Sequence, residues 1–106
     1  MTAFDDRERA YEAGFANEQE REFRARARRD KAMGYWMGEK IGLTGAELEN
    51  YVLSVWRADL KQPGDQDVLA KLMRDSDVHG LGLTEEEVLR RMRQELASAR
   101  EEVARS

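Results

Sequence analysis

One stretch of the sequence places carboxylates at the spacing of calcium ligands. In residues 75–86, DSDVHGLGLTEE, Asp75, Asp77 and Glu86 occupy positions 1, 3 and 12 of a calcium-binding loop. Calcium prefers oxygen ligands, but His79 at position 5 offers ring nitrogens. Capping at the end of one helix and at the start of the next would explain the same residues. A degenerate calcium-binding module therefore stays one alternative for this chain.

Other chemistry finds little support in the sequence. The chain has no cysteine, only one histidine, and no glycine-rich phosphate loop. Acidic residues are abundant, but 38% of the residues are charged, so two neighbouring carboxylates are no evidence of a catalytic pair. We therefore expect no enzyme activity, and we assign no catalytic, cofactor-binding or metal-binding residues.

The most informative pattern is a stripe of aromatic residues near the N-terminus. On a helix, Phe4, Tyr11 and Phe15 fall within roughly 40° of one another, because spacings of seven and four match helical turns. Beyond Phe15, the positions that would continue this stripe are charged: Glu18, Glu22, Arg26 and Arg29. The stripe therefore cannot run continuously into an apolar core.

An isolated helix of this length is marginal in water, and Gly14 weakens it by about 1 kcal/mol relative to alanine. Ordering the backbone costs about 1–2 kcal/mol per residue, which burial of three aromatic side chains does not offset alone. We predict that residues 1–17 are mobile and partly disordered alone, and become helical on a partner. The alternative is a frayed terminus that packs back on its own domain.

Charge is distributed unevenly along the chain, although the net charge is only −4. Residues 1–20 hold six acidic residues and two arginines, whereas residues 21–31 hold six basic and two acidic residues. Four of these basic residues share a helical face: Arg21, Arg24, Arg28 and Lys31. A small nucleic-acid-binding helical protein that uses this face is a second alternative. The acidic N-terminus and the net charge argue against it, so we expect no nucleic-acid partner.

Length and composition favour one small cytoplasmic domain. The chain has 106 residues, and its acidic opening is not followed by a hydrophobic signal region. The run from Ala32 to Gly38 is far shorter than the roughly 20 apolar residues of a membrane span. We expect no insertion into a membrane.

The hydrophobic periodicity predicts an all-α protein, a small four-helix bundle (residues 18–106) preceded by the mobile segment 1–17. The helices are expected at about residues 18–41, 45–60, 65–78 and 85–104. Short turns between them favour antiparallel neighbours.

Each predicted helix has an apolar face that should form the core. The positions are Phe23, Ala27, Gly34, Met37 and Ile41, then Leu48, Tyr51, Val52, Val55 and Trp56, then Val68, Leu69, Leu72 and Met73, and finally Val88, Leu89, Met92, Leu96, Ala99 and Val103. Trp36, Trp56 and Tyr51 are expected to stabilise the interior.

The predicted helix ends carry characteristic residues. Thr44 and Thr84 each begin a capping box with a glutamate three residues later, and Asp65 is a suitable N-cap. Gly42 and Gly80 can end the helices that precede them.

Four stretches together resemble a known family, the zeta subunit of alphaproteobacterial F-type ATP synthases, whose members inhibit ATP hydrolysis. These stretches are TAFDDRERAYEAGFANEQE, ARRDKAMGYW, VWRADLKQPGDQDV and the amphipathic C-terminal helix. The resemblance covers nearly the whole chain. It implies a four-helix bundle with a mobile inhibitory N-terminus.

The resemblance also implies a partner and a mechanism. The segment from Thr2 to Asn17 would become helical in an interface between catalytic subunits of the ATPase head, which is built from alpha, beta and gamma subunits. Its anchors would be Phe4, Tyr11 and Phe15, and its polar contacts Asp5, Asp6, Arg7, Glu8 and Arg9. The protein would be a monomer when free and would lie on the cytoplasmic side of the inner membrane when bound.

Overall fold

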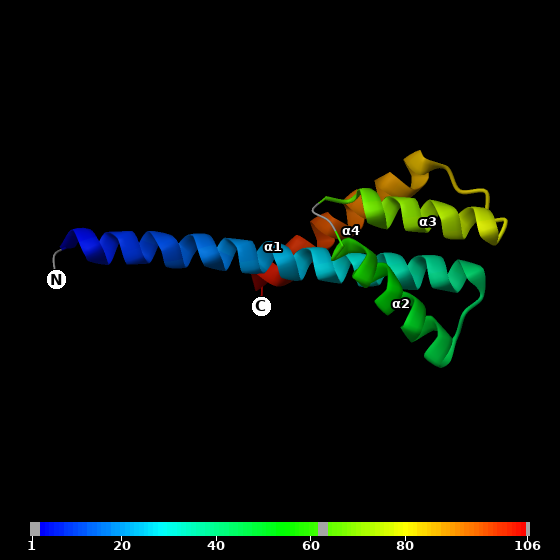
Figure 1. The fold of residues 1–106 in the computed structure, drawn as a ribbon, viewed down its shortest axis with the longest axis horizontal. Coiled ribbons are helices and arrows are strands. Elements are labelled where there is room, and N and C mark those ends of the chain that lie inside the picture. The colour runs from blue at the N-terminus through cyan, green and yellow to red at the C-terminus, as the bar shows by residue number, and fades with distance from the viewer. Residues whose placement is uncertain (1–2, 62–63, 106) are drawn as a thin grey trace.

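Four α-helices make up the computed structural model of the chain (Figure 1). The structure describes the backbone of residues 3–61 and 64–105, and the side chains of residues 17–61 and 64–105. The helices are α1 (Ala3–Ile41), α2 (Gly45–Asp59), α3 (Gln66–Val78) and α4 (Glu85–Arg105). No strand occurs in these described ranges. The predicted all-α, four-helix fold is therefore confirmed.

The first helix is longer than predicted, because α1 begins at Ala3 and not near residue 18. At about 1.5 Å per residue, its 39 residues account for most of the longest dimension of the molecule, 63 Å. Figure 1 shows the N-terminal part of α1 extending beyond the other three helices. The division at residue 17 does not coincide with a break in the helix, and it stays a prediction.

The main core lies where all four helices meet. Its buried residues come from every helix: Met33, Met37, Val55, Val68, Leu72, Val88 and Met92. A smaller cluster of Ala25, Ala99 and Val103 joins α1 to the end of α4. Seven of the fifteen positions predicted for the inner faces of α2, α3 and α4 are among these buried residues. Five more are partly buried and pack against them: Tyr51, Leu69, Met73, Leu89 and Leu96.

Gly34 allows α1 and α2 to approach closely. A Cβ atom built on Gly34 would lie 2.8 Å from the Cα atom of Val52, a contact with backbone that cannot simply move aside. The prediction that Gly34 faces the core is confirmed, and its missing side chain is what permits the contact.

Two aromatic residues predicted for the interior lie elsewhere. Phe23 is 57% exposed, and Trp56 is half-buried at the surface. Periodicity identifies the face of a helix but not how far its neighbours extend, and α2 ends at Asp59, close to this part of α1. Trp36 and Tyr51 do pack against the main core, although neither is fully buried.

The helix ends agree with the sequence in part. Thr84 Oγ1 accepts a hydrogen bond from the amide of Glu87 at 3.1 Å, as the capping box predicts. Thr44 makes no such bond, so this prediction is wrong; Gly45 follows with a φ of 58°, which departs from helical geometry in the first turn. Gly80, with a φ of 66°, has the predicted left-handed conformation.

Candidate functional site

The predicted partner-binding residues all belong to the N-terminal part of α1. By their backbone positions they lie within the helix: Phe4, Asp5, Asp6, Arg7, Glu8, Arg9, Tyr11 and Phe15. Their side chains lie outside the described residues, so the contacts assigned to them stay predictions.

The side chains that follow this segment are exposed. All five residues from Asn17 to Arg21 are exposed to solvent. The first fully buried side chain of the described part of α1 is Ala25, which packs against α4. The bundle therefore covers α1 only from about residue 22 onward.

A buried polar cluster lies where this cover begins. Arg29 is 1% exposed and Asp30 is fully buried, and Arg29 Nε donates a hydrogen bond to Asp30 Oδ1 at 2.8 Å. Arg29 also donates to Asp65 Oδ1 at 2.9 Å and lies 3.7 Å from Asp59 Oδ2. We call Arg26, Arg29, Asp30, Asp59 and Asp65 the polar cluster.

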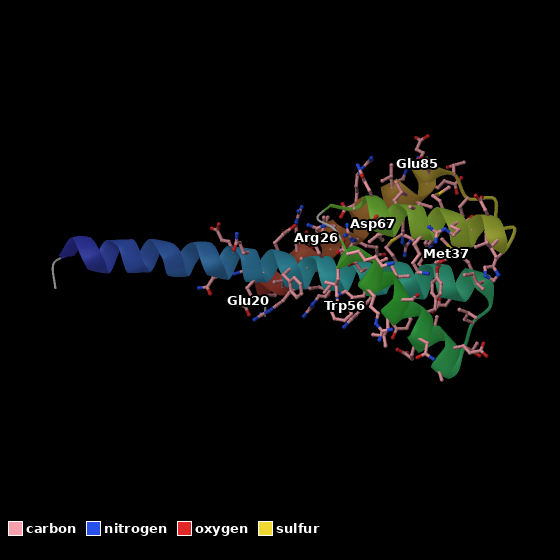
Figure 2. All side chains as sticks on the ribbon, viewed as in Figure 1. Glu20, Arg26, Met37, Trp56, Asp67 and Glu85 are labelled. Carbon is pink, nitrogen blue, oxygen red and sulfur yellow. The ribbon has the colours of Figure 1, made fainter. Side chains whose placement is uncertain are left out.

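Arg26 completes the cluster from the more exposed side. It donates to Asp65 Oδ1 at 3.0 Å and to Asp59 Oδ1 at 3.5 Å. Figure 2 labels Arg26 on α1 at this end of the bundle. Since Asp59 ends α2 and Asp65 precedes α3, the cluster fastens the α2–α3 connection to α1.

The cluster retains a proton at neutral pH. It contains two guanidinium groups and three carboxyl groups, one more negative group than positive. Burial, together with a hydrogen bond to Asp59, raises the pKa of Asp30 to about 8. A proton on Asp30 also gives a role to Asp30 Oδ2, which is buried and accepts no hydrogen bond. The hydrogen bond from Arg29 lowers the pKa of Asp65, which stays ionised.

Sequence analysis missed the polar cluster. Arg26 and Arg29 were interpreted only as charges that interrupt an apolar stripe, and Asp65 only as an N-cap. In the structure Asp65 does occupy the N-cap position of α3, but its carboxylate binds the two arginines and makes no cap hydrogen bond. The available signal was the pair of aspartates, Asp59 and Asp65, that flank the segment between two predicted helices, which periodicity does not take into account.

Ion pairs also occupy part of the predicted basic face. Arg24 donates to Glu20 at 2.7 Å, and Arg28 donates to Glu102 at 3.0 Å. Lys31 lies over the ring of Trp56, 5.6 Å from its centroid. With two of the four basic groups paired to carboxylates, the structure does not favour the nucleic-acid alternative.

The calcium ligands proposed from sequence do not come together. Asp75 and Asp77 lie within α3, and Asp75 Oδ2 accepts a hydrogen bond from the Tyr51 hydroxyl at 2.6 Å. Asp75 also pairs with Lys71 at 3.1 Å. Among residues 17–61 and 64–105, no group of three or more histidine or acidic side chains could hold a metal ion. The calcium alternative is therefore not supported.

A surface groove lies between α1 and α2 beside the polar cluster. Its volume is about 440 Å³, and its apolar lining consists of Phe23, Ala27, Trp56 and Leu60. Lys61 and Arg26 contribute to its rim. We call this feature the α1–α2 groove. It is open to solvent, and Gln19, Glu22 and Asp59 also line it.

Over the described ranges, none of the helices combines the length and the apolar character that a membrane span requires.

A family model described as ATPase inhibitor subunit zeta matches residues 1–102, which include both the N-terminal segment and the bundle. No curated protein matches the sequence.

Proposed function

This chain belongs to the ATPase inhibitor subunit zeta family, and from that premise we propose that it inhibits the F-type ATP synthase by inserting residues 1–17 into a catalytic subunit interface. The family is named for inhibition of an ATPase, so membership supports an inhibitory, regulatory role for the chain. The inserted helix and its target interface are the proposed part.

The observation that carries the proposal is the extent of the family match. It covers residues 1–102, so the N-terminal segment belongs to the family as much as the bundle does. The length of α1 supports the assignment of roles, because this helix continues beyond the region that the other helices cover. A helix in that position can enter a partner without unfolding the bundle.

The mechanism is steric and needs no bond chemistry. In the proposal, Phe4, Tyr11 and Phe15 anchor one face of the helix in the interface, and Asp5, Asp6, Arg7, Glu8 and Arg9 contact its polar edges. A helix held between catalytic subunits blocks the closing motion that hydrolysis requires. The partner is then the catalytic head of alpha, beta and gamma subunits, on the cytoplasmic side of the inner membrane.

A titration of purified ATPase heads tests this proposal. The full chain should inhibit ATP hydrolysis in a saturable manner, and a chain that lacks residues 1–17 should not inhibit at any concentration reached by the full chain. Circular dichroism of the shortened chain checks that the bundle remains helical. Equal inhibition by both chains would exclude the N-terminal segment as the inhibitory part.

The aromatic anchors have a separate test in the full-length chain. Tyr11→Ala and Phe15→Ala should each weaken inhibition by about 1 kcal/mol or more, since truncated interface anchors have effects of this size. Ala13→Ser provides the matched control, because residue 13 lies on the opposite helical face. The measurement is the concentration that gives half-maximal inhibition; unchanged values for both anchor variants would contradict their assignment.

A further inference from the structure

The polar cluster joins carboxyl groups of very different exposure through one arginine. Asp30 is fully buried, whereas the side chain of Asp65 is 46% exposed. Arg29 Nε donates to Asp30 Oδ1 at 2.8 Å, and Arg29 Nη2 donates to Asp65 Oδ1 at 2.9 Å. The second of these contacts reaches from α1 to the start of α3. A change in the pairing of Arg29 therefore changes the attachment of the α2–α3 connection.

Asp30 has an oxygen atom for which the structure provides no donor. Its Oδ2 atom is buried and has no hydrogen-bond partner, and the carboxyl group of Asp59 lies within hydrogen-bonding reach of Asp30. A protonated carboxyl group can donate to Asp59, but an ionised carboxylate only accepts. Loss of the proton therefore leaves two carboxylates side by side. It also makes both oxygens of Asp30 available to one guanidinium group, which binds a carboxylate best in a bidentate geometry.

The other charged groups around Asp30 determine which contact breaks. Arg29 of α1 and Asp59 of α2 face it directly, and around them lie Arg26, Asp65 and the Glu22–Arg100 pair of α1 and α4. With Asp30 ionised, the cluster has three carboxylates for two guanidinium groups. Asp65 has the most exposed side chain of the three, so water can replace its hydrogen bond from Arg29. Its remaining contact with Arg26 is a partly exposed ion pair, which contributes little to stability.

We propose that the polar cluster is a pH-controlled latch: when Asp30 releases its proton to solvent, Arg29 exchanges Asp65 for the second oxygen of Asp30, and the α2–α3 connection separates from α1. Burial raises the pKa of Asp30 to about 8, so the exchange occurs between neutral and mildly alkaline pH. Only the connection moves, because the main core contains no member of the cluster. The inference concerns the protein alone and does not depend on the proposed function.

Carbon-detected NMR of the unmodified chain tests the exchange without relying on amide protons, which exchange rapidly at alkaline pH. The carboxyl carbon of Asp30 should titrate with a midpoint at about pH 8. The Cα signals of Leu60 and Gly64, in the α2–α3 connection, should shift with the same midpoint. Leu43 and Thr44, in the α1–α2 connection, are the matched control and should not shift. The proposal is overturned if Asp30 does not titrate in the neutral to alkaline range, or if it titrates while the α2–α3 connection stays fixed.

The two tryptophans measure whether the release is local. Trp56, labelled in Figure 2, lines the α1–α2 groove together with Leu60 and Lys61 of the connection, whereas Trp36 packs against the main core. Trp36→Phe and Trp56→Phe each leave one reporter in the chain. Above the midpoint, acrylamide should quench Trp56 about twofold more strongly than below it, because local opening exposes the ring, and quenching of Trp36 should stay constant. An equal response from both tryptophans would mean that the whole bundle loosens and that no latch exists.

Carboxyl variants in the Trp36→Phe background assign the response to the exchange. Asp30→Asn cannot ionise but can still donate to Asp59, so Trp56 should stay protected at every pH. Asp65→Asn weakens the contact that the latch releases and keeps a residue suited to the N-cap, so Trp56 should be strongly quenched even at neutral pH. Asp67→Asn is the matched control, because Asp67 lies in the first turn of α3 and forms no ion pair among the described residues.

The variants leave two results that would contradict the latch. One is a pH response of Trp56 that persists in Asp30→Asn, which would assign the proton to another group. The other is an Asp65→Asn chain that titrates like the Asp67→Asn control, which would show that Asp65 is not the contact that is released. Circular dichroism at neutral pH verifies that each variant is folded, and the NMR titration of the unmodified chain tests the latch whether or not a variant folds.

Discussion

The two halves of α1 belong to one helix but have different surroundings. In the C-terminal half, Met33 and Met37 are completely buried, and the helix contacts α2, α3 and α4. At the start of the described side chains, residues 17–21 are all exposed, and Figure 1 shows α1 extending beyond the end of α4, whose Arg100 pairs with Glu22. Most helical stability in proteins comes from tertiary packing. A continuous helix therefore does not imply uniform stability.

The polar cluster and the α1–α2 groove lie at the boundary between these halves. The cluster ties α1 to the α2–α3 connection through Arg29, while the groove leaves Phe23 exposed just before it. The same stretch of α1 thus fixes the bundle and follows the N-terminal segment that we assign to the partner. Substitutions on either side of this boundary should have different consequences.

The largest difference should come from arginine substitutions. Arg29→Ala should lower the free energy of unfolding by about 3–5 kcal/mol, because it removes the buried guanidinium group that pairs with Asp30 and Asp65. Arg24→Ala removes an arginine whose side chain is 55% exposed and, among the described residues, pairs only with Glu20, so the loss should be within about 0.5 kcal/mol. Urea denaturation followed by circular dichroism measures both. Equal losses of unfolding free energy in the two variants would show that the buried polar cluster does not separate the packed half of α1 from the exposed half.

The same glycine substitution should have opposite effects in the two halves. Gly34→Ala should lower the free energy of unfolding by about 1–3 kcal/mol, because the new methyl group overlaps the backbone of Val52. Gly14→Ala should instead increase helical content, since alanine favours a helix by about 1 kcal/mol over glycine. Thermal unfolding and the amplitude of the helical circular dichroism signal distinguish these results. A destabilising Gly14→Ala would mean that the N-terminal half is also packed.

Sequence reasoning predicted what depends on local periodicity. The apolar faces of α2, α3 and α4 repeat at helical spacing, so buried positions such as Val55, Leu72 and Met92 could be found from the sequence. The left-handed conformation of Gly80 could be found in the same way, because a glycine followed a periodic segment. These features are determined by a few neighbouring residues.

What the sequence did not predict depends on contacts between distant residues. Arg29 is buried only because Asp59 and Asp65, which are 30 and 36 positions away, meet it in space. Phe23 is 57% exposed although periodicity places it on the inner face of α1, because periodicity does not show how far the neighbouring helices extend along α1. The side chains of the predicted anchors, including Tyr11, lie outside the described residues, so their assignment still rests on the sequence and the family.

Asp30 makes the stability of the bundle half depend on pH. Its pKa is raised to about 8 in the folded protein, against about 3.9 for an ordinary aspartate. Between these values the folded protein holds a proton that the unfolded chain has released, so stability decreases as pH rises through this window. The pKa values of Asp65 and Glu22 are lowered in the folded protein. Their contribution to stability is therefore lost as the pH falls into the acidic range, and it does not change between about pH 6 and about pH 9. From about pH 6 to about pH 9 we expect a loss of about 1 kcal/mol or more.

Asp30→Asn should remove most of this pH dependence. The asparagine oxygen can still accept from Arg29, and the asparagine amide can donate to Asp59 as the protonated carboxyl does. Urea denaturation of both proteins at about pH 6 and about pH 9 makes the comparison. A slope that persists unchanged in the variant would place the proton on another group. If the slope disappears, the proton belongs to the cluster that holds the α2–α3 connection to α1.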